Sequence, residues 1–229
     1  MSGRRHPRAI LLDALGTLVA LAPPAPRLRD ELALRFGVRV SSGQAERAIA
    51  AEIAYYRAHL DEGRDAATLR ELRRRCARAL CDQLPPEAAA LPIDSLTEAL
   101  LASITFTAFA DVAPALAAAR SRGMRLVVLS NWDLSLHDVL AGLGIAPLLD
   151  AVVTSAECGA RKPDPRIFAA GLHLAGVAPA DAVHVGDSLE EDVAGARAAA
   201  IEPVLIRRDG SAGPPGTRTV ASLSELVVT

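Results

Sequence analysis

The amino-acid sequence predicts an α/β protein in which a doubly wound parallel sheet carries an all-helical domain inserted after its first strand. Three observations predict this fold. Short apolar segments have the length of strands, helical segments alternate with them from about residue 110 onward, and the region between residues 23 and 107 has helical periodicity without a convincing strand. The chain has 229 residues, of which 51% are hydrophobic, so it can bury a sizeable core.

The predicted strands are apolar along their whole length instead of alternating with polar residues. This pattern is typical of strands that are covered on both faces, as in parallel sheets. Four segments have the length and composition of strands, and a fifth and a weaker sixth follow near the carboxyl end of the chain. In order, they are residues 9–13, 125–130, 151–155, 182–186, 203–206 and 217–220.

The predicted helices of the sheet domain lie between these strands. They cover residues 112–122, 136–142, 166–176 and 191–200, and the first of them ends before Gly123. Strand and helix therefore alternate as in a Rossmann-like core.

The region after the first strand breaks this alternation and shows helical spacing instead. Apolar residues recur three or four positions apart in two stretches, which are Ile49, Ile53, Tyr56 and Leu60, and then Leu69, Leu72, Cys76 and Leu80. We therefore predict an α/β core of residues 1–20 and 109–229 and a helical cap of residues 21–108. Such an insertion follows the carboxyl end of the first strand, where ligands bind in open α/β sheets.

Composition excludes several classes of protein. Lys and Arg total 25 against 27 Asp and Glu, so the net charge of −2 leaves no basic excess for nucleic-acid binding. No apolar run approaches the roughly 20 residues of a membrane span. The three cysteines, Cys76, Cys81 and Cys158, have neither disulfide-framework nor zinc-site spacing, so we expect a reduced cytoplasmic protein. Independently of the cysteines, we expect either a monomer or a homodimer.

The amino-terminal residues superficially resemble a secretory signal. Arg4, Arg5 and Arg8 precede an apolar stretch, as the basic residues of such a signal do. Because Asp13 and Gly16 interrupt that stretch, we expect no export.

Polar clusters follow the first two core strands. Asp13 ends the first apolar run and precedes Gly16 and Thr17, and a carboxylate at a strand end can serve as a nucleophile or a metal ligand. A turn explains the same residues. After the second core strand, Ser130 and Asn131 offer a hydroxyl and an amide that suit an anionic oxygen, although a helix N-cap uses the same residue types.

Two further clusters lie near the next strands. Lys162, before Pro163, is the only lysine among 25 basic residues, which indicates that a compact ammonium is needed there, although a solvated surface lysine is the alternative. Asp187 and Asp192 follow the strand of residues 182–186, and their carboxylates could hold Mg²⁺ or simply favour a helix N-terminus. The five histidines lack metal-ligand spacing, and His184, inside a strand, is expected to be a core or edge residue.

The four clusters, taken in order, resemble the haloacid dehalogenase-like hydrolase superfamily, in the branch with a helical cap after the first strand. The resemblance extends from Asp13 to Asp192 and implies the strand order 3-2-1-4-5, which places Asp13, Ser130 and Asp187 at one crevice. It also implies that Asp13 attacks the substrate and forms a covalent aspartyl ester, and that Lys162 and Ser130 hold the transferring group.

The resemblance implies a metal site and a substrate site as well. Asp13, Asp187 and the backbone carbonyl of Leu15 would bind Mg²⁺, and Asp192 would support it through water. Thr17 and Asn131 would contact the substrate, which we expect to be a small anionic metabolite carrying a phosphate.

Leu15 departs from the family pattern, because phosphatases of this family usually have there a second Asp that acts as general acid and base. Its loss typically costs about 10²–10⁴-fold in rate. The substrate could have a leaving group that needs no proton, such as an acyl or aryl phosphate. Alternatively, Asp133 or a residue of the cap supplies the proton.

Two other functions fit Leu15. A 2-haloacid dehalogenase lacks both this acid and the metal, and a catalytically weak binding or regulatory protein needs neither. Without a cation, however, the charge of Asp187 beside Asp13 would repel a carboxylate substrate. We therefore favour a Mg²⁺-dependent phosphohydrolase.

Overall fold

The computed structural model of the chain describes residues 7–226, so Arg4 and Arg5 of the signal-like segment lie outside the described residues. The chain divides into two compact units. We call Met1–Ala20 with Ala108–Thr229 the core unit, and Leu21–Thr107 the helical unit. That the helical unit acts as a cap stays a prediction.

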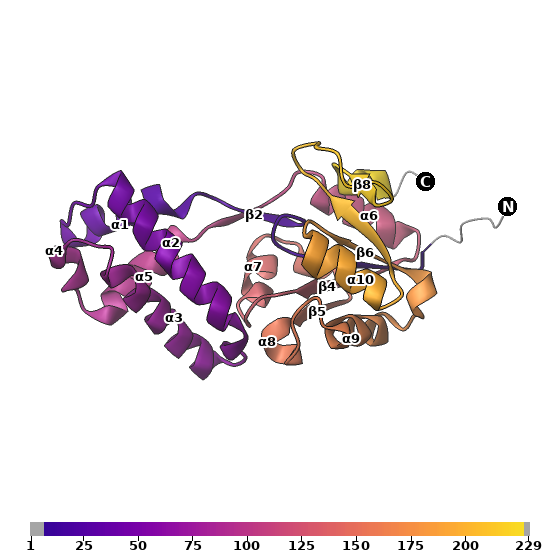
Figure 1. Cartoon of the computed structure of the whole chain (residues 1–229), viewed down its shortest axis with the longest axis horizontal. Coiled ribbons are helices and arrows are strands. Elements are labelled where there is room, and N and C mark those ends of the chain that lie inside the picture. Colours follow the sequence, from indigo (N-terminus) through magenta and orange to yellow (C-terminus); the bar gives the residue numbers. More distant parts are fainter. Residues whose placement is uncertain (1–6, 227–229) are drawn as a thin grey trace. The chain divides into compact units, whose positions relative to one another are not determined.

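The core unit is built on a six-stranded parallel sheet with the order β5-β4-β1-β6-β7-β8 (Figure 1). In sequence order of the predicted strands this is 3-2-1-4-5-6, so the predicted order is confirmed. The register sets Leu11 of β1 beside Val127 of β4 on one side and His184 of β6 on the other. The strands are β1 (Ala9–Leu12), β4 (Arg125–Ser130), β5 (Ala151–Thr154), β6 (Ala182–Gly186), β7 (Glu202–Ile206) and β8 (Arg218–Val220).

Helices cover both faces of this sheet, which explains why its strands are continuously apolar. In Figure 1, α6 and α9 lie on opposite sides of the strands, and both pack against β4. The α9 side forms one apolar cluster that includes Leu11, Leu129 and Phe168. The helices of the core unit are α6 (Val112–Ser121), α7 (Leu136–Gly142), α8 (Ser155–Cys158), α9 (Pro165–Ala175) and α10 (Gly195–Ala198), and three-residue 3₁₀ turns lie at Ala146–Leu148 and Pro179–Asp181.

The helix predicted over residues 191–200 begins before residue 191 in the structure, and its first turn is wider than an α-helical turn. Residues Leu189–Ala194 form a helical segment in which the Val193 N–H reaches the Ser188 carbonyl, five residues back, at 3.1 Å. Such widened turns are rare and occur often at functional sites. Asp192 lies in this segment.

The helical unit contains α1 (Pro24–Phe36), α2 (Ser42–His59), α3 (Ala66–Cys81), α4 (Pro86–Ala89) and α5 (Ile93–Ser103), with a 3₁₀ turn at Leu60–Glu62. Capping boxes at Ser41 and Asp65 fix the starts of α2 and α3. Most residues of the predicted apolar periodicity lie in one cluster or against it, as Ile49 and Leu72 do inside it and Ile53 at its edge. Leu60 and Leu69 are buried as well, outside that cluster.

A two-stranded sheet of β2 (Val19–Leu21) and β3 (Phe106–Ala108) lies where the chain passes between the units. The prediction that no strand lies between residues 23 and 107 is therefore wrong at its end. Three residues are too few to show a period of two, and these strands depend on pairing between segments distant in the sequence.

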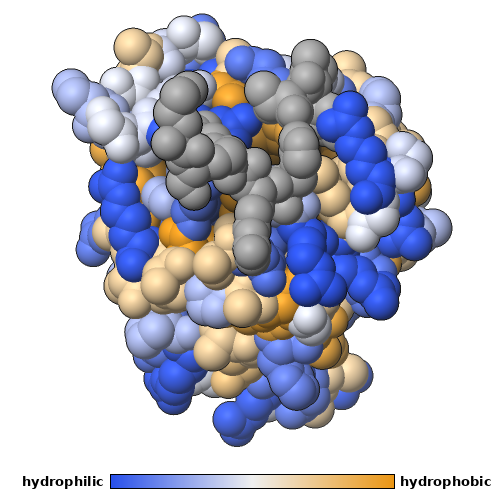
Figure 2. Space-filling model, turned by 90° about the vertical axis from the view of Figure 1, so that its right-hand side faces the viewer, coloured by the Kyte–Doolittle hydropathy of each residue, from blue (hydrophilic) through white to orange (hydrophobic). Residues whose placement is uncertain are grey.

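None of the helices in residues 7–226 is long and apolar enough to cross a membrane. On the part of the surface that is visible and coloured in Figure 2, hydrophilic side chains and apolar areas are interspersed.

Candidate active site

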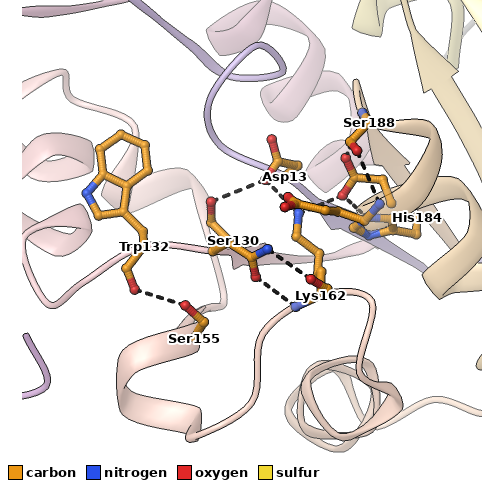
Figure 3. A network of polar contacts seen from close by, with 10 residues as sticks. Asp13, Ser130, Trp132, Ser155, Lys162, His184 and Ser188 are labelled. Atoms are coloured by element: carbon orange, nitrogen blue, oxygen red, sulfur yellow. Dashed lines mark hydrogen bonds and ion pairs between the residues drawn. The ribbon is translucent and has the colours of Figure 1, made fainter. Parts of the chain in front are cut away.

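The polar clusters predicted from the sequence meet at the carboxyl edge of the parallel sheet. Asp13 directly follows β1, Ser130 is the last residue of β4, and Asp187 directly follows β6. Because β1 lies between β4 and β6, these three positions are neighbours. Lys162 reaches the same place from the loop between α8 and α9 (Figure 3).

Lys162 is the centre of the site. Its side chain is 1% exposed, and its Nζ lies 2.6 Å from Asp13 Oδ1 and 2.6 Å from Asp192 Oδ1. A buried ammonium in contact with two carboxylates is the opposite of a solvated surface lysine, which excludes the alternative interpretation of this residue. Ser130 completes the group, because its hydroxyl donates to Asp13 Oδ1 at 3.2 Å.

Asn131 fixes the loop that carries Lys162. Its side-chain amide donates to the Lys162 carbonyl at 3.0 Å and accepts from the Lys162 N–H at 2.7 Å. Both ends of the amide are thus bound to backbone. Substrate binding by Asn131 stays a prediction.

Thr17 and Leu15 lie in the loop after Asp13. Thr17 is fully buried, its carbonyl accepts a hydrogen bond from Arg208, and its Oγ1 has no hydrogen-bond partner among the described residues. Leu15 is 38% exposed and its backbone bridges to Val19. Substrate binding by Thr17 and metal binding by the Leu15 carbonyl both stay predictions.

Asp192 is held by three donors. Lys162 Nζ and His184 Nε2 both contact Oδ1, at 2.6 and 2.8 Å, and the Ser188 N–H donates to Oδ2 at 3.0 Å. Room for the carboxylate comes from Gly186, where a Cβ would lie 2.1 Å from Asp192 Cγ. His184 was not predicted as a site residue, and the sequence offers no metal-ligand spacing that would have indicated it.

Three carboxylates of the site could hold one cation. Oxygen atoms of Asp13, Asp187 and Asp192 all lie within 4.8 Å of one another. Gly16 permits the approach of Asp187, since a Cβ on Gly16, whose φ is 79°, would lie 2.2 Å from Asp187 Oδ2. Because hard oxygen ligands of this kind are those that Mg²⁺ prefers, the donor set fits that ion.

The charge balance of the site also fits a cation. Burial raises the pKa of Asp13 to about 7; Asp192 and Asp187 act in the same direction and Lys162 opposes them. Burial and Asp192 likewise raise the pKa of Asp187. For Asp192, burial would raise the pKa, but Lys162 and His184 outweigh it and lower the value. One ammonium therefore compensates three carboxylates incompletely, and a divalent ion would supply the missing positive charge.

Asp133, considered above as a substitute acid, is engaged locally. It is 3% exposed, and its Oδ1 accepts from the Ser135 N–H at 2.7 Å and from the Ser135 hydroxyl at 2.5 Å. This arrangement organises the turn that precedes α7. A role of Asp133 as proton donor stays a prediction.

Comparison with known proteins gives a family match over most of the chain. A family model described as haloacid dehalogenase-like hydrolase matches residues 7–200. The chain is 48% identical over 87 residues to haloacid dehalogenase-like hydrolase domain-containing protein 3 of Bos taurus, which covers 38% of this chain and 35% of that protein. It is 44% identical over 94 residues to a phosphoserine phosphatase of Thermus thermophilus, which covers 41% and 38% of the two chains. The matched segments thus span little more than a third of these curated relatives.

Solved structures resemble the whole chain. A HAD phosphatase from Thermococcus onnurineus has a TM-score of 0.66 at 25% identity and covers 96% of this chain and 95% of its own. A 2-haloacid dehalogenase from Pseudomonas syringae has a TM-score of 0.65 at 26% identity and covers 96% of both chains. The fold is thus similar to that of solved proteins described as a phosphatase and as a dehalogenase.

Proposed function

The chain belongs to the haloacid dehalogenase-like hydrolases, and we propose that it is a Mg²⁺-dependent phosphohydrolase that acts on a small phosphorylated metabolite. The observation that carries this proposal is the position of Asp187, whose carboxylate oxygen lies within 4.8 Å of those of Asp13 and Asp192. An anionic substrate can enter such a site only if a cation offsets the carboxylates, and Mg²⁺ with a phosphate group satisfies that requirement. The likeness to a phosphoserine phosphatase and to a HAD phosphatase supports the same activity.

In this proposal Asp13 is the nucleophile. One of its carboxylate oxygens forms a bond to phosphorus while the bond from phosphorus to the leaving oxygen breaks, and the leaving group departs with that electron pair. Water then cleaves the resulting aspartyl phosphate, which releases inorganic phosphate and restores the Asp13 carboxylate.

Other residues of the site orient the phosphate group and compensate its negative charge. Lys162, whose ammonium already contacts Asp13 Oδ1, would bind a phosphate oxygen and reduce its repulsion from Asp13. Ser130 would turn its hydroxyl from Asp13 to the same phosphate. Asp13, Asp187 and the Leu15 carbonyl would hold Mg²⁺ and Asp192 would support it through water, and the ion would supply further positive charge.

Leu15 limits the substrates that this site can use. A leucine cannot protonate an alkoxide, so we expect acyl or aryl phosphates, whose leaving groups need no proton, to react faster than alkyl phosphates. This preference distinguishes the proposal from one in which Asp133 or a residue of the helical unit supplies the acid.

A 2-haloacid dehalogenase is the second candidate, favoured by Leu15 and by the likeness to the Pseudomonas syringae enzyme. A halide leaves without a proton and needs no acid at residue 15. Asp187 argues against this candidate, since it would add a negative charge beside a carboxylate substrate. A catalytically weak binding or regulatory protein is the third candidate.

The test measures hydrolysis of acetyl phosphate, p-nitrophenyl phosphate and phosphoserine by the purified chain, with Mg²⁺ or with EDTA. We expect Mg²⁺-dependent turnover in which the first two substrates react faster than phosphoserine. We also expect Asp13→Asn to lower kcat at least about 10³-fold, because an amide is a poor nucleophile.

Asp164→Asn is the matched control, because this aspartate caps α9 and pairs with Arg166 on the surface. It should keep normal turnover. Release of chloride from 2-chloropropionate in EDTA would instead support the dehalogenase, and no turnover with either set of substrates would support the binding protein.

A further inference from the structure

His184 is a fully buried polar residue for which the proposed reaction has no direct use. It lies in β6, whose neighbour β1 leads to Asp13, and its backbone is in register with Leu11. Phe168 packs edge-on against its ring, with 5.1 Å between ring centroids. The ring is thus fixed inside the sheet and its α9 layer.

The Nε2 atom of His184 points at the carboxylate that anchors Lys162. It lies 2.8 Å from Asp192 Oδ1, the same oxygen that lies 2.6 Å from Lys162 Nζ (Figure 3). An ionised carboxylate only accepts hydrogen bonds, so Nε2 carries the hydrogen and donates it. His184, Asp192, Lys162 and Asp13 therefore form one chain of contacts that ends at the nucleophile.

We propose that His184 is a positioning residue, which fixes Asp192 so that Asp192 holds the Lys162 ammonium against Asp13. Two donors fix the orientation of the Asp192 carboxylate independently of Lys162, one on each oxygen: Nε2 of His184 on Oδ1 and the Ser188 N–H on Oδ2. Without His184 the carboxylate keeps only the Ser188 bond besides Lys162 itself, so the orientation of Oδ1 is fixed less firmly about the Cβ–Cγ axis. Lys162 would then lose its fixed partner opposite Asp13.

A simpler explanation is that His184 is a core residue whose ring nitrogen has found the nearest acceptor. The two explanations differ in what a donor-free side chain does to Lys162. If His184 only fills space, an apolar replacement of similar length leaves the ammonium unchanged. If it positions Asp192, the same replacement disturbs the ammonium, and a replacement that can donate a hydrogen bond restores it.

Lys162 can be observed directly, because it is the only lysine of the chain. Selective ¹⁵N labelling of lysine side chains therefore gives one ammonium resonance. We would compare the wild type with His184→Met, which has no donor, and with His184→Gln, which has nearly the same length and keeps one. Val183→Ala, next to His184 in β6 and equally part of the buried sheet, controls for loss of packing.

We expect His184→Met to shift or broaden the Lys162 resonance and to lower kcat about 10–100-fold. The His184→Gln and Val183→Ala variants should keep the resonance, with kcat within about threefold of the wild type. An unchanged resonance in His184→Met, or an equal effect of His184→Met and His184→Gln, would overturn the proposal.

The wild type offers a second measurement that does not depend on folding of a variant. Long-range ¹H–¹⁵N spectra of the histidine rings should show His184 with its hydrogen on Nε2, protected from exchange with water. A hydrogen on Nδ1 alone would overturn the proposal.

The expected change in kcat rests on the proposed function, whereas neither of the two spectroscopic measurements depends on it. An absence of turnover in the wild type would therefore contradict the phosphohydrolase and leave the role of His184 to be decided by the spectra.

Discussion

Each of the two units buries a carboxyl group, but the contacts and the pKa of that group differ between the units. In the core unit, Asp192 is 1% exposed and contacts both Lys162 and His184, and its pKa lies below the ordinary range. In the helical unit, Glu52 of α2 is 5% exposed and contacts the Cys76 thiol, and no ion pair with it is found within residues 7–226. Burial raises the pKa of Glu52 to about 7.

The comparison shows that burial alone does not decide whether an acid is charged. The desolvation of a carboxylate disfavours its ionised form in both units, and only the core unit supplies an ammonium in contact with it. Asp13 lies between the two cases, because it shares Lys162 with Asp192 and its pKa is raised to about 7. The core unit thus keeps Asp192 ionised, and the helical unit keeps Glu52 neutral in mildly acidic solution.

Removal of the shared ammonium tests this comparison most strongly. Lys162→Met leaves Asp13 and Asp192 without their common cation, so we expect the free energy of unfolding to fall by about 3–5 kcal/mol and turnover to be lost. Urea unfolding in EDTA measures the first effect. Adding Asp192→Asn to Lys162→Met should recover part of the stability, because it removes the uncompensated charge; equal stability of the two variants would contradict this account.

The acid of the helical unit should give the second largest effect, as a dependence of stability on pH. Between about pH 4.5 and pH 7, Glu52 is protonated in the folded chain and ionised in the unfolded chain. The folded state therefore binds more protons, and its stability falls as pH rises through this range, by about 3 kcal/mol in total.

Glu52→Gln should remove this fall and leave the variant more stable than the wild type at pH 8. The measurement is urea unfolding at several pH values. Glu46→Gln, at an exposed position of the same helix, is the matched control and should follow the wild-type profile. Parallel profiles of wild type and Glu52→Gln would contradict the assignment.

The smallest expected effect comes from a comparison of alanine substitutions at two glycines, Gly37 and Gly16, which have similar backbone φ angles. Gly37 ends α1 with a φ of 68° and has nothing within 4 Å of where a Cβ would lie, whereas Gly16 approaches Asp187 closely. Gly37→Ala should lower stability by about 1 kcal/mol, from backbone strain alone, and leave kcat unchanged. Gly16→Ala should also displace Asp187 and lower kcat at least about tenfold. Equal activity of the two variants would mean that Asp187 does not need its observed position.

Much of the core unit could be predicted because each of its strands is apolar along its length. The segments of residues 125–130 and 182–186 are strands with those same bounds, and the helix expected at residues 166–176 is Pro165–Ala175. The sequence did not indicate β2 and β3, because three-residue strands carry no period and are formed by their pairing.

The site was predicted in part, for reasons that differ among its residues. Lys162 was conspicuous as the only lysine, and Asp13 and Asp187 each follow an apolar strand. His184 and Glu52 had no such signal: each is one polar residue in an apolar segment, and no property of that segment states which partner it meets. The side-chain amide of Asn131 was expected to face an anion. It binds the loop of Lys162, which the sequence did not indicate, and its contact with an anion stays a prediction.

The sequence by itself therefore determined the strands of the parallel sheet, the helical insertion and the acids that could do chemistry, because apolar patterning and residue type are local properties. Which of those acids is charged was decided only by the tertiary structure. Lys162 lies 149 residues from Asp13 in the chain, and their contact exists only because the loop after α8 reaches the end of β1. The electrostatic free energy of these groups depends on the distances between their charges and on their burial. Neither quantity can be read from the amino-acid sequence.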